Sequence, residues 1–412
     1  MMTVDLGGVV VVTALIAGTL SLALFGIKVY HWQRDRLRGA RRAHYIAAVG
    51  ETLARGLPAV FDRGWAEDPL FHEVLLQYFD VVAGEERSHL EDLITAVDLR
   101  NRMVVRLRES KRESARLVAA AHLATAASPD IEWALLEALG SASPEIKIHA
   151  AAGLSSIGSD RAIPKLVHML LTESPWVSAR IADQLVSYGT AAVDPLIESI
   201  QDEHGTLLET RIVVAVVRAL GYIGDLRAAP ALTPLLTHPE VDVRVAAAGA
   251  LASAGTPDTV GMLISALSDP RWEVRARAAS SLATFSDPAA AEPLAGCLRD
   301  SSWWVRQNAA EALIEIPGGI EVLIAVLSGD DAYARDAALQ QLGLNGMIRS
   351  ARDRIQRGEG SDRDRRLVTA VELAPPIPFS EQRARTDESD EEAPPTGIRP
   401  NEALELSEAA TS

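Results

Sequence analysis

Apolar positions recur with one period over most of the chain. A column of leucines is spaced by 29 to 35 residues, most often by 31: Leu123, Leu154, Leu185, Leu220, Leu251, Leu282, Leu313 and Leu342. A repeat of this length is typical of a solenoid, in which helix pairs stack and each pair contacts only its neighbours. The pattern therefore predicts an all-α fold, an α-solenoid of about eight helix pairs.

Each unit divides into two helices. The first carries apolar residues at i, i+3, i+4 and i+7, as in residues 273–285, and ends just after the leucine. Glycines four residues after the leucine predict helix ends with positive φ, at Gly158, Gly189, Gly224 and Gly255. Prolines then open the second helix, at Pro164, Pro195, Pro230 and Pro293. Leucines four apart in that helix predict one face packed on the first: Leu166 and Leu170, Leu232 and Leu236, Leu263 and Leu267, and Leu294 and Leu298.

A second column lies seven residues before each leucine and is basic at six of eight positions. Its members are Arg116, Lys147, Ser178, Val213, Arg244, Arg275, Arg306 and Arg335. We expect Arg244, Arg275 and Arg306 to bind loop carbonyls or the carboxylates of adjacent units, for which Asp242, Asp269 and Asp300 are the candidates. The column would then form a ladder between repeats and not an anion-binding site.

Residues 238–255, 269–285 and 300–316 share the basic residue, the alanines, the leucine and the turn in one register. These segments resemble HEAT repeats of the phycobilisome-lyase subtype, and the resemblance covers about 240 of 412 residues. The chain departs from the pattern at Ser178, at Val213, at the four extra residues 202–205 and in the shortened turn 316–319. The resemblance implies a recognition platform. Because enzymes that attach bilins gave the subtype its name, the alternative is a bilin lyase or isomerase-like enzyme, or a chaperone, that uses the concave face.

The second strong signal precedes the solenoid. Residues 6–27 carry no charge, and 22 helical residues span the roughly 30 Å hydrocarbon core of a bilayer. The sequence therefore predicts a transmembrane helix at 6–28 after a short extracytoplasmic N-terminus, residues 1–5. Basic residues follow it, at Arg34, Arg36, Arg38, Arg41 and Arg42, which predicts a single-pass cell-membrane protein with the solenoid in the cytoplasm. Small residues at Ala14 and Gly18 would let two anchors pair, but nothing else supports a homodimer.

Two regions flank the repeats. Residues 29–110 are expected to form a basic juxtamembrane and helical capping region, residues 111–355 the solenoid, and residues 356–412 an acidic disordered tail. From Glu381 onward the tail holds nine acidic residues against three arginines. We expect its strip 387–392 to dock on the basic run between Arg100 and Arg116, unless that run is a solvated helix face.

Composition narrows the function classes. A net charge of −16 argues against nucleic-acid binding. The single cysteine, Cys297, fits a reducing compartment and a packed side chain. The nine histidines lack ligand spacing, and no catalytic motif is present in the sequence. We therefore expect no catalytic residue, no metal and no cofactor.

The surface of the solenoid offers two candidate binding features. Trp176, Trp272, Trp303 and Trp304 precede the basic column and would form either an aromatic edge or covers over the joints between repeats. Second-helix positions outside the core would face a partner from the concave side: His168, Glu198, Thr233, Ser265 and Arg299. The sequence thus indicates a non-catalytic, membrane-tethered scaffold or adaptor. Its expected partners are the bilayer and a protein, such as an integral membrane enzyme or transporter.

Overall fold

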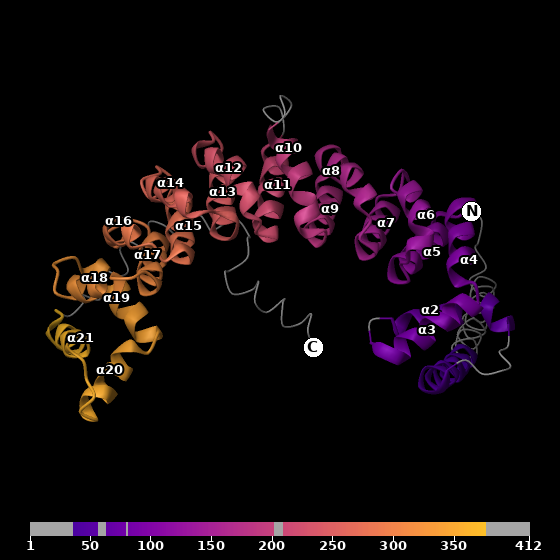
Figure 1. Ribbon diagram of the computed structural model, residues 1–412, viewed down its shortest axis with the longest axis horizontal. Coiled ribbons are helices and arrows are strands. Elements are labelled where there is room, and N and C mark those ends of the chain that lie inside the picture. The colour runs from indigo at the N-terminus through magenta and orange to yellow at the C-terminus, as the bar shows by residue number, and fades with distance from the viewer. Residues whose placement is uncertain (1–35, 57–62, 80, 202–208, 376–412) are drawn as a thin grey trace, which may run out of the picture. The chain divides into compact units, whose positions relative to one another are not determined.

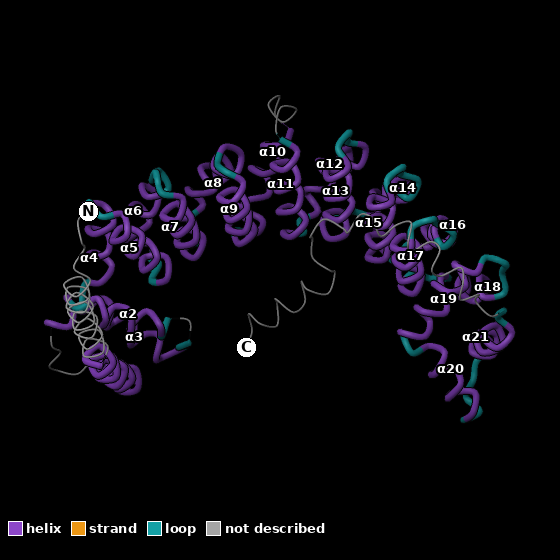
Figure 2. Tube along the Cα trace, turned by 180° about the vertical axis from the view of Figure 1, so that it is seen from behind, coloured by secondary structure: helices purple, strands orange, loops and turns teal. Residues whose placement is uncertain are grey.

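The computed structural model describes residues 36–56, 63–79, 81–201 and 209–375, which belong to two compact units, Met1–Ala162 and Ile163–Ser412. Every regular element in these ranges is a helix, and they contain no strand (Figures 1 and 2). The prediction of an all-α solenoid is confirmed. The expected membrane anchor lies outside the described residues. Among the helices that are described, none has both the length and the apolar character needed to cross a bilayer.

The first unit begins with a helix over residues 36–55. Its other elements are η1 Arg63–Glu67, α2 Pro69–Gln77, α3 Gly84–Ala96, α4 Leu99–Glu109, α5 Glu113–Thr125, η2 Pro129–Ile131, α6 Glu132–Ala138, α7 Pro144–Ile157 and η3 Asp160–Ala162. Helix α5 carries the first leucine of the repeat and packs between α4 and α7. Helix α4 therefore covers the side of α5 that no preceding repeat covers.

Arginines expected beside a membrane make contacts with α2. Arg38 pairs with Glu73 at 3.0 Å, Arg41 pairs with Asp68 at 3.5 Å, and Arg42 donates to Gln77. These contacts are exposed, so each contributes at most about 1 kcal/mol to stability. They orient the helix over residues 36–55 on α2.

The second unit contains the remaining repeats. Its elements are α8 Ile163–Thr172, α9 Pro175–Ser187, η4 Gly189–Ala192, α10 Val193–Gln201, α11 Thr210–Ile223, η6 Leu226–Ala228, α12 Ala229–Leu232, η7 Thr233–Thr237, α13 Val241–Ala254, η8 Pro257–Thr259, α14 Val260–Ala266, α15 Trp272–Leu282, η9 Ala283–Phe285, η10 Pro288–Ala290, α16 Ala291–Cys297, α17 Trp303–Glu315, α18 Gly319–Leu327, α19 Ala332–Leu344, α20 Met347–Gln356 and α21 Asp362–Leu373.

These helices form two rows. An inner row consists of α9, α11, α13, α15, α17 and α19, each packed on the next, and an outer row consists of α8, α10, α12, α14, α16 and α18 (Figures 1 and 2). The inner row lies on the inside of the bend within the second unit. Small residues explain the bend, because a Cβ placed on Gly221 of α11 would lie only 2.7 Å from Ala250 Cα of α13. Inner-row helices can thus approach closely.

All eight leucines of the repeat are buried, with at most 1% of their surface exposed. The paired leucines of the second helices are buried as well. Both apolar columns therefore meet between the rows, and the periodic pattern correctly located the core.

Three of the four predicted glycine turns have the expected backbone. Gly158, Gly189 and Gly224 have φ values of 72°, 57° and 71°, and Gly158 and Gly224 cap α7 and α11 in the left-handed conformation. The prediction is wrong at Gly255, whose φ is −82°. Glycine is needed there because a Cβ would lie 2.8 Å from the ring of Phe285.

The boundary predicted for the acidic tail is also wrong. Residues 362–373 form α21, which packs on α18 and α20. Ser361 and Asp364 form a reciprocal capping box at its start, and Leu367 is buried. The sequence from Glu359 to Arg366 is strongly polar, so its helical signal is local capping and not an apolar stripe. Residues 376–412, with the acidic strip, lie outside the described residues.

Candidate functional site

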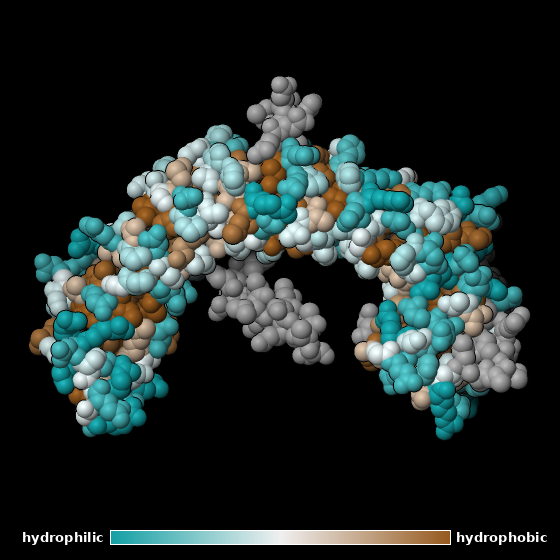
Figure 3. All heavy atoms as spheres, in the orientation of Figure 1, coloured by the Kyte–Doolittle hydropathy of each residue, from teal (hydrophilic) through white to brown (hydrophobic). Residues whose placement is uncertain are grey.

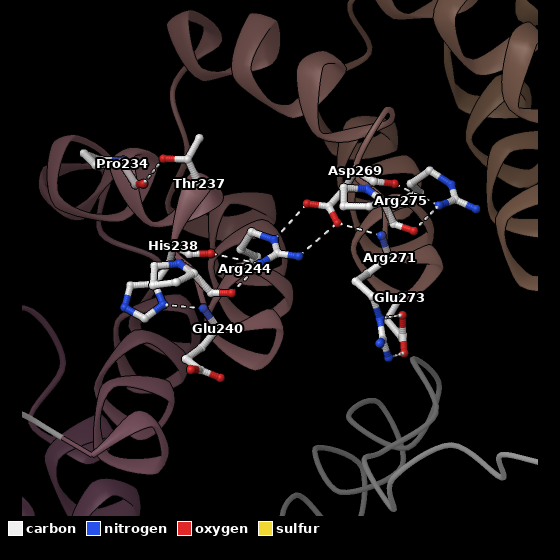
Figure 4. A network of polar contacts seen from close by, with 11 residues as sticks. Pro234, Thr237, His238, Glu240, Arg244, Asp269, Arg271, Glu273 and Arg275 are labelled. Carbon is white, nitrogen blue, oxygen red and sulfur yellow. Dashed lines mark hydrogen bonds and ion pairs between the residues drawn. The ribbon is translucent and has the colours of Figure 1, made fainter.

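The basic column forms a ladder between repeats (Figure 4). Arg244 of α13 donates from Nε to Asp269 Oδ2 at 2.8 Å and from Nη2 to Oδ1 at 3.1 Å, while Nη1 donates to the main-chain oxygen of His238 at 2.9 Å. Arg275 of α15 binds Asp300 in the same way, at 2.7 and 2.8 Å. Two parallel bonds to one carboxylate fix both partners in orientation as well as distance.

Each arginine–aspartate pair is one rung of the ladder, and each aspartate also contacts the arginine of the next rung. Asp269 gives its carboxylate to Arg244 and its main-chain oxygen to Arg275 at 2.8 Å. Asp300 gives its carboxylate to Arg275 and its main-chain oxygen to Arg306 at 2.8 Å. The predicted ladder is therefore confirmed at Asp269 and Asp300. Asp242 lies in the first turn of α13 and is not the acid that Arg244 binds.

At five of the eight repeats, the residue 25 positions after the basic-column member accepts the main-chain N–H two residues later. Asp269 accepts from Arg271 N at 2.8 Å, and Asp300 accepts from Ser302 N at 2.8 Å. Other residues fill the same place elsewhere: Ser141 opposite Arg116, His238 opposite Val213 and Asp331 opposite Arg306 accept from Ser143, Glu240 and Tyr333. The position therefore stabilises the turn that leads into an inner-row helix, even opposite Val213, which has no guanidinium.

Electrostatics keep the Arg275–Asp300 pair ionised. Burial acts to raise the pKa of Asp300, but hydrogen bonds from Arg275 and Ser302 and the charges of Arg275 and Arg306 outweigh it, so that the pKa lies below its ordinary value. The bond to Asp300 raises the pKa of Arg275 against the effect of burial. Charges that satisfy each other in this way hold repeats together and leave little charge for a ligand.

A hollow of about 390 Å³ lies beside the Arg244 rung, between η7 and α14. Leu236, Met262 and Ala266 supply its apolar lining, and Ser265 and Asp269 lie at its polar edge. Its size is at the lower end for small-ligand sites. Because Asp269 is already bound to Arg244, the hollow suits an apolar side chain better than a charged ligand.

The expected partner-binding residues lie on the outer row. His168 is on α8, Glu198 on α10, Ser265 on α14 and Arg299 just after α16, and all four are exposed. Thr233, at the start of η7, is half-buried and donates to the main-chain oxygen of Ala229 at 2.7 Å. Their assignment to the concave side is wrong, because the alanine-rich helices pack most closely and so take the inside of the bend (Figure 1).

The four tryptophans occupy two adjacent columns at the starts of inner-row helices. Trp176 and Trp304 lie nine residues before their leucines, with 52% and 49% of their surface exposed. Trp272 and Trp303 lie ten before, and Trp272 is half-buried. Trp303 and Trp304 pack edge to face, with ring centroids 4.8 Å apart. A role in covering the contact between neighbouring repeats explains the position of the half-buried Trp272. It does not explain why the other three indoles are exposed.

Apolar side chains on the face shown in Figure 3 lie in separate patches among polar residues. Scattered exposure of this kind is ordinary for a folded surface. The tryptophan pair stands out from it because two large rings are exposed side by side.

The remaining candidate side chains are structural. Cys297 is buried, and burial together with Asp300 raises the pKa of its thiol to about 11, so it is a packed side chain as expected. His122 of α5 is desolvated, and with the nearby charges of His72 and Arg106 this lowers its pKa to about 4, against an opposing effect of Glu73. Among the described residues, no group of three metal-ligating side chains could hold an ion.

The basic run of the first unit is partly neutralised. Arg100 binds Glu91 and the main-chain oxygen of Ala126. Arg108 pairs with Glu137 at 3.1 Å and lies over the ring of Trp133, with 5.1 Å to the centroid. Arg116 donates to the main-chain oxygen of Leu107 at 3.0 Å. These contacts join different helices, so part of the run is engaged within the fold.

Known proteins can be compared with this geometry. The family model for HEAT repeats matches residues 101–186, 134–213, 209–264 and 260–343, which together cover more than half of the chain. The chain belongs to the HEAT-repeat family. None of the curated proteins matches its sequence.

Several solved structures are similar to the chain at low identity. An engineered protein is 20% identical, covers 76% of this chain and 98% of its own, and has a TM-score of 0.38. The complex of CpcE and CpcF of phycocyanin lyase from Nostoc sp. PCC7120 is 24% identical over 60% of this chain and 94% of its own, with a TM-score of 0.30. The karyopherin Kap121p bound to the extreme C-terminus of the protein phosphatase Cdc14p is 13% identical over 84% and 49%, with a TM-score of 0.43. These likenesses concern the fold alone.

Proposed function

We propose that this HEAT-repeat chain is a non-catalytic scaffold whose solenoid binds a partner protein. The observation that carries the proposal is the Trp303–Trp304 pair, exposed by 37% and 49% and packed edge to face at 4.8 Å. Tryptophan is enriched among the residues that dominate binding energy at protein interfaces. Trp176 adds a third exposed indole at the equivalent position of another repeat.

We further propose that the scaffold is tethered to the cell membrane, with the solenoid in the cytoplasm. The uncharged run 6–27 is long enough to span a bilayer, and the arginines that follow it favour the cytoplasm for everything C-terminal. A tether confines the solenoid to the membrane surface and raises its effective concentration toward other membrane proteins. The partner we favour is therefore an integral membrane enzyme or transporter, which the scaffold assembles or regulates.

Cross-linking in native membranes followed by mass spectrometry tests both parts. The double variant Trp303→Ala and Trp304→Ala should lose the cross-linked partner while keeping the unfolding midpoint of the original chain. Trp133→Ala removes an indole of equal exposure, 50%, from the first unit and should leave the cross-link in place. Recovery of the same partner with the double variant would contradict the proposed surface.

A bilin titration tests the catalytic alternative. The purified chain mixed with a free bilin should leave the absorbance spectrum of the pigment unchanged. A shifted band that grows with protein concentration would contradict the non-catalytic assignment.

A further inference from the structure

Two arginines on the inner row lack acidic partners. Arg277 of α15 and Arg218 of α11 have no ion pair or side-chain hydrogen bond within the described residues. Neighbouring charges of the same row are paired, since Arg180 binds Asp183 at 3.6 Å and Arg211 binds Glu209. The two unpaired guanidiniums are therefore a local excess of positive charge on a chain with a net charge of −16.

The side chain of Arg277 lies across the middle of α13. A Cβ placed on Gly249 would lie 3.3 Å from Arg277 Cδ and 3.4 Å from Nε, so the side chain of Arg277 packs directly on this glycine. Burial and then the charge of Arg218 lower the pKa of Arg277, while Tyr222 acts in the opposite direction. Arg277 of α15 thus lies against Gly249 of α13 and is close enough to Arg218 and Tyr222 of α11 for their charges to act on it. We call Arg218, Tyr222, Gly249, Ser253 and Arg277 the α13 patch.

Two like charges held together over a small-residue surface favour an anionic occupant. The sequence supplies one, because residues 387–392 carry five carboxylates in six positions. We propose that the strip 387–392 binds the α13 patch, with its carboxylates on Arg218 and Arg277. Charge complementarity and covalent attachment both favour this occupant over an acidic segment of another protein.

The connecting chain is long enough for this contact. Residues 376–386 span at most about 36–40 Å when extended. Packed helices lie about 8–10 Å apart, and four such steps separate α21 from α13, through α18, α17 and α15, which gives roughly 32–40 Å. The strip can therefore reach the patch within the same unit. The basic run between Arg100 and Arg116 is a weaker partner, since Arg100 and Arg108 already bind Glu91 and Glu137.

A distance measurement on the full chain tests the contact. Spin labels are attached through Ser253→Cys in the patch and Ser389→Cys in the strip, and Cys297 stays unlabelled because it is buried with a raised pKa. Pulsed electron paramagnetic resonance at low salt should show a short-distance population. The same strip label paired with Ser265→Cys on the outer row should not show it. Raising the salt to about 0.5 M should remove the population, because the Debye length falls to roughly 4 Å.

Charge variants give the decisive comparison. Arg218→Gln with Arg277→Gln should reduce the short-distance population about fivefold. Arg299→Gln removes an exposed arginine from the outer row and should leave the population unchanged. Reversing both arginines to glutamate should abolish the population, and reversing the strip carboxylates to lysine in the same chain should restore it. A population that survives the double glutamine variant, or none at Ser253 at low salt, would overturn the proposal.

Discussion

Arg275 and Asp300, 25 residues apart, are joined by two parallel hydrogen bonds of 2.7 and 2.8 Å, from Nε and Nη2 to the two carboxylate oxygens. The pair is mostly buried, with 14% and 12% of the two side chains exposed. Asp300 also holds the N-terminus of α17 through Ser302 N. One carboxylate therefore links two inner-row helices and also accepts the main-chain N–H that precedes the second helix.

Removal of that carboxylate should be costly. Asp300→Ala leaves Arg275 buried without its acid and removes the acceptor of Ser302 N before α17, and breaking a buried pair costs about 3–5 kcal/mol. Asp242→Ala serves as the control, because Asp242 is exposed and lies outside the ladder. Urea unfolding followed by circular dichroism measures both. Equal midpoints for the two variants would show that the rung contributes no net stability.

Leu282 is fully buried between the rows. Leu282→Ala should lower the free energy of unfolding by about 2–5 kcal/mol, the usual cost of emptying a leucine site. The matched control is Leu344→Ala, since 73% of Leu344 is exposed. A denaturant titration that gave both variants the same stability would argue against the assigned core.

Alanine variants in the two tryptophan columns should distinguish a role in stability from a role in partner binding. Trp272 is half-buried, so Trp272→Ala should cost about 2 kcal/mol or more in unfolding free energy. Trp304→Ala should cost less than Trp272→Ala, about 1–2 kcal/mol, because half of its surface is already in water. Thermal melts of both variants check this. A folded, stable Trp272→Ala chain that no longer binds its partner would instead assign that indole to the interface.

His122 should make the first unit sensitive to acid. Its pKa is about 4 in the fold against an ordinary 6.5, so the unfolded chain binds the proton first as pH falls. The stability is complete above about pH 6.5 and decreases toward pH 4, by up to about 3 kcal/mol. His122→Gln should flatten this decrease, whereas His168→Gln, at an exposed site, should not. Unfolding curves at pH 7 and pH 5 would contradict the assignment if both variants behaved alike.

The membrane proposal predicts protection from external protease. Protease added to intact cells should leave residues 43–412 uncut, because the arginines after the apolar run keep them inside. Permeabilised cells provide the control for digestion. Fragments of the solenoid released from intact cells would place it on the other side of the membrane.

Much of the fold follows from residue types at fixed spacing. The leucines of the column, from Leu123 to Leu342, are buried because a period near 31 returns each one to the same place in its unit. Arg244 and Arg275 bind acids as expected, since a buried guanidinium requires an acceptor. These features depend on the repeat pattern of residue types, which can be read from a single sequence.

Other features depend on how closely helices approach one another in space, which the spacing of residues in the sequence does not reveal. The bend of the second unit follows from how closely Gly221 meets Ala250, and it reverses the expected concave face. The patch at Arg218 and Arg277 appears only when three helices lie side by side. The turn-forming positions 25 residues after the basic column are visible in the sequence. Their members Ser141, His238 and Asp331 differ too much in residue type, however, to suggest one shared role.

Val213 interrupts the arginine column at the joint where α11 and α13 meet, and there Gly221 and Ala250 bring the two backbones together. One joint thus depends on shape, whereas those after α13 and α15 depend on ionised carboxylates. Acid neutralises carboxylates, but it does not change the close packing of Gly221 on Ala250. The pKa of Asp300 lies below its ordinary value, so the joint at Asp300 should loosen only as pH falls below the ordinary range of aspartate, while α11 and α13 stay docked. Acid would then divide the array into separately melting segments.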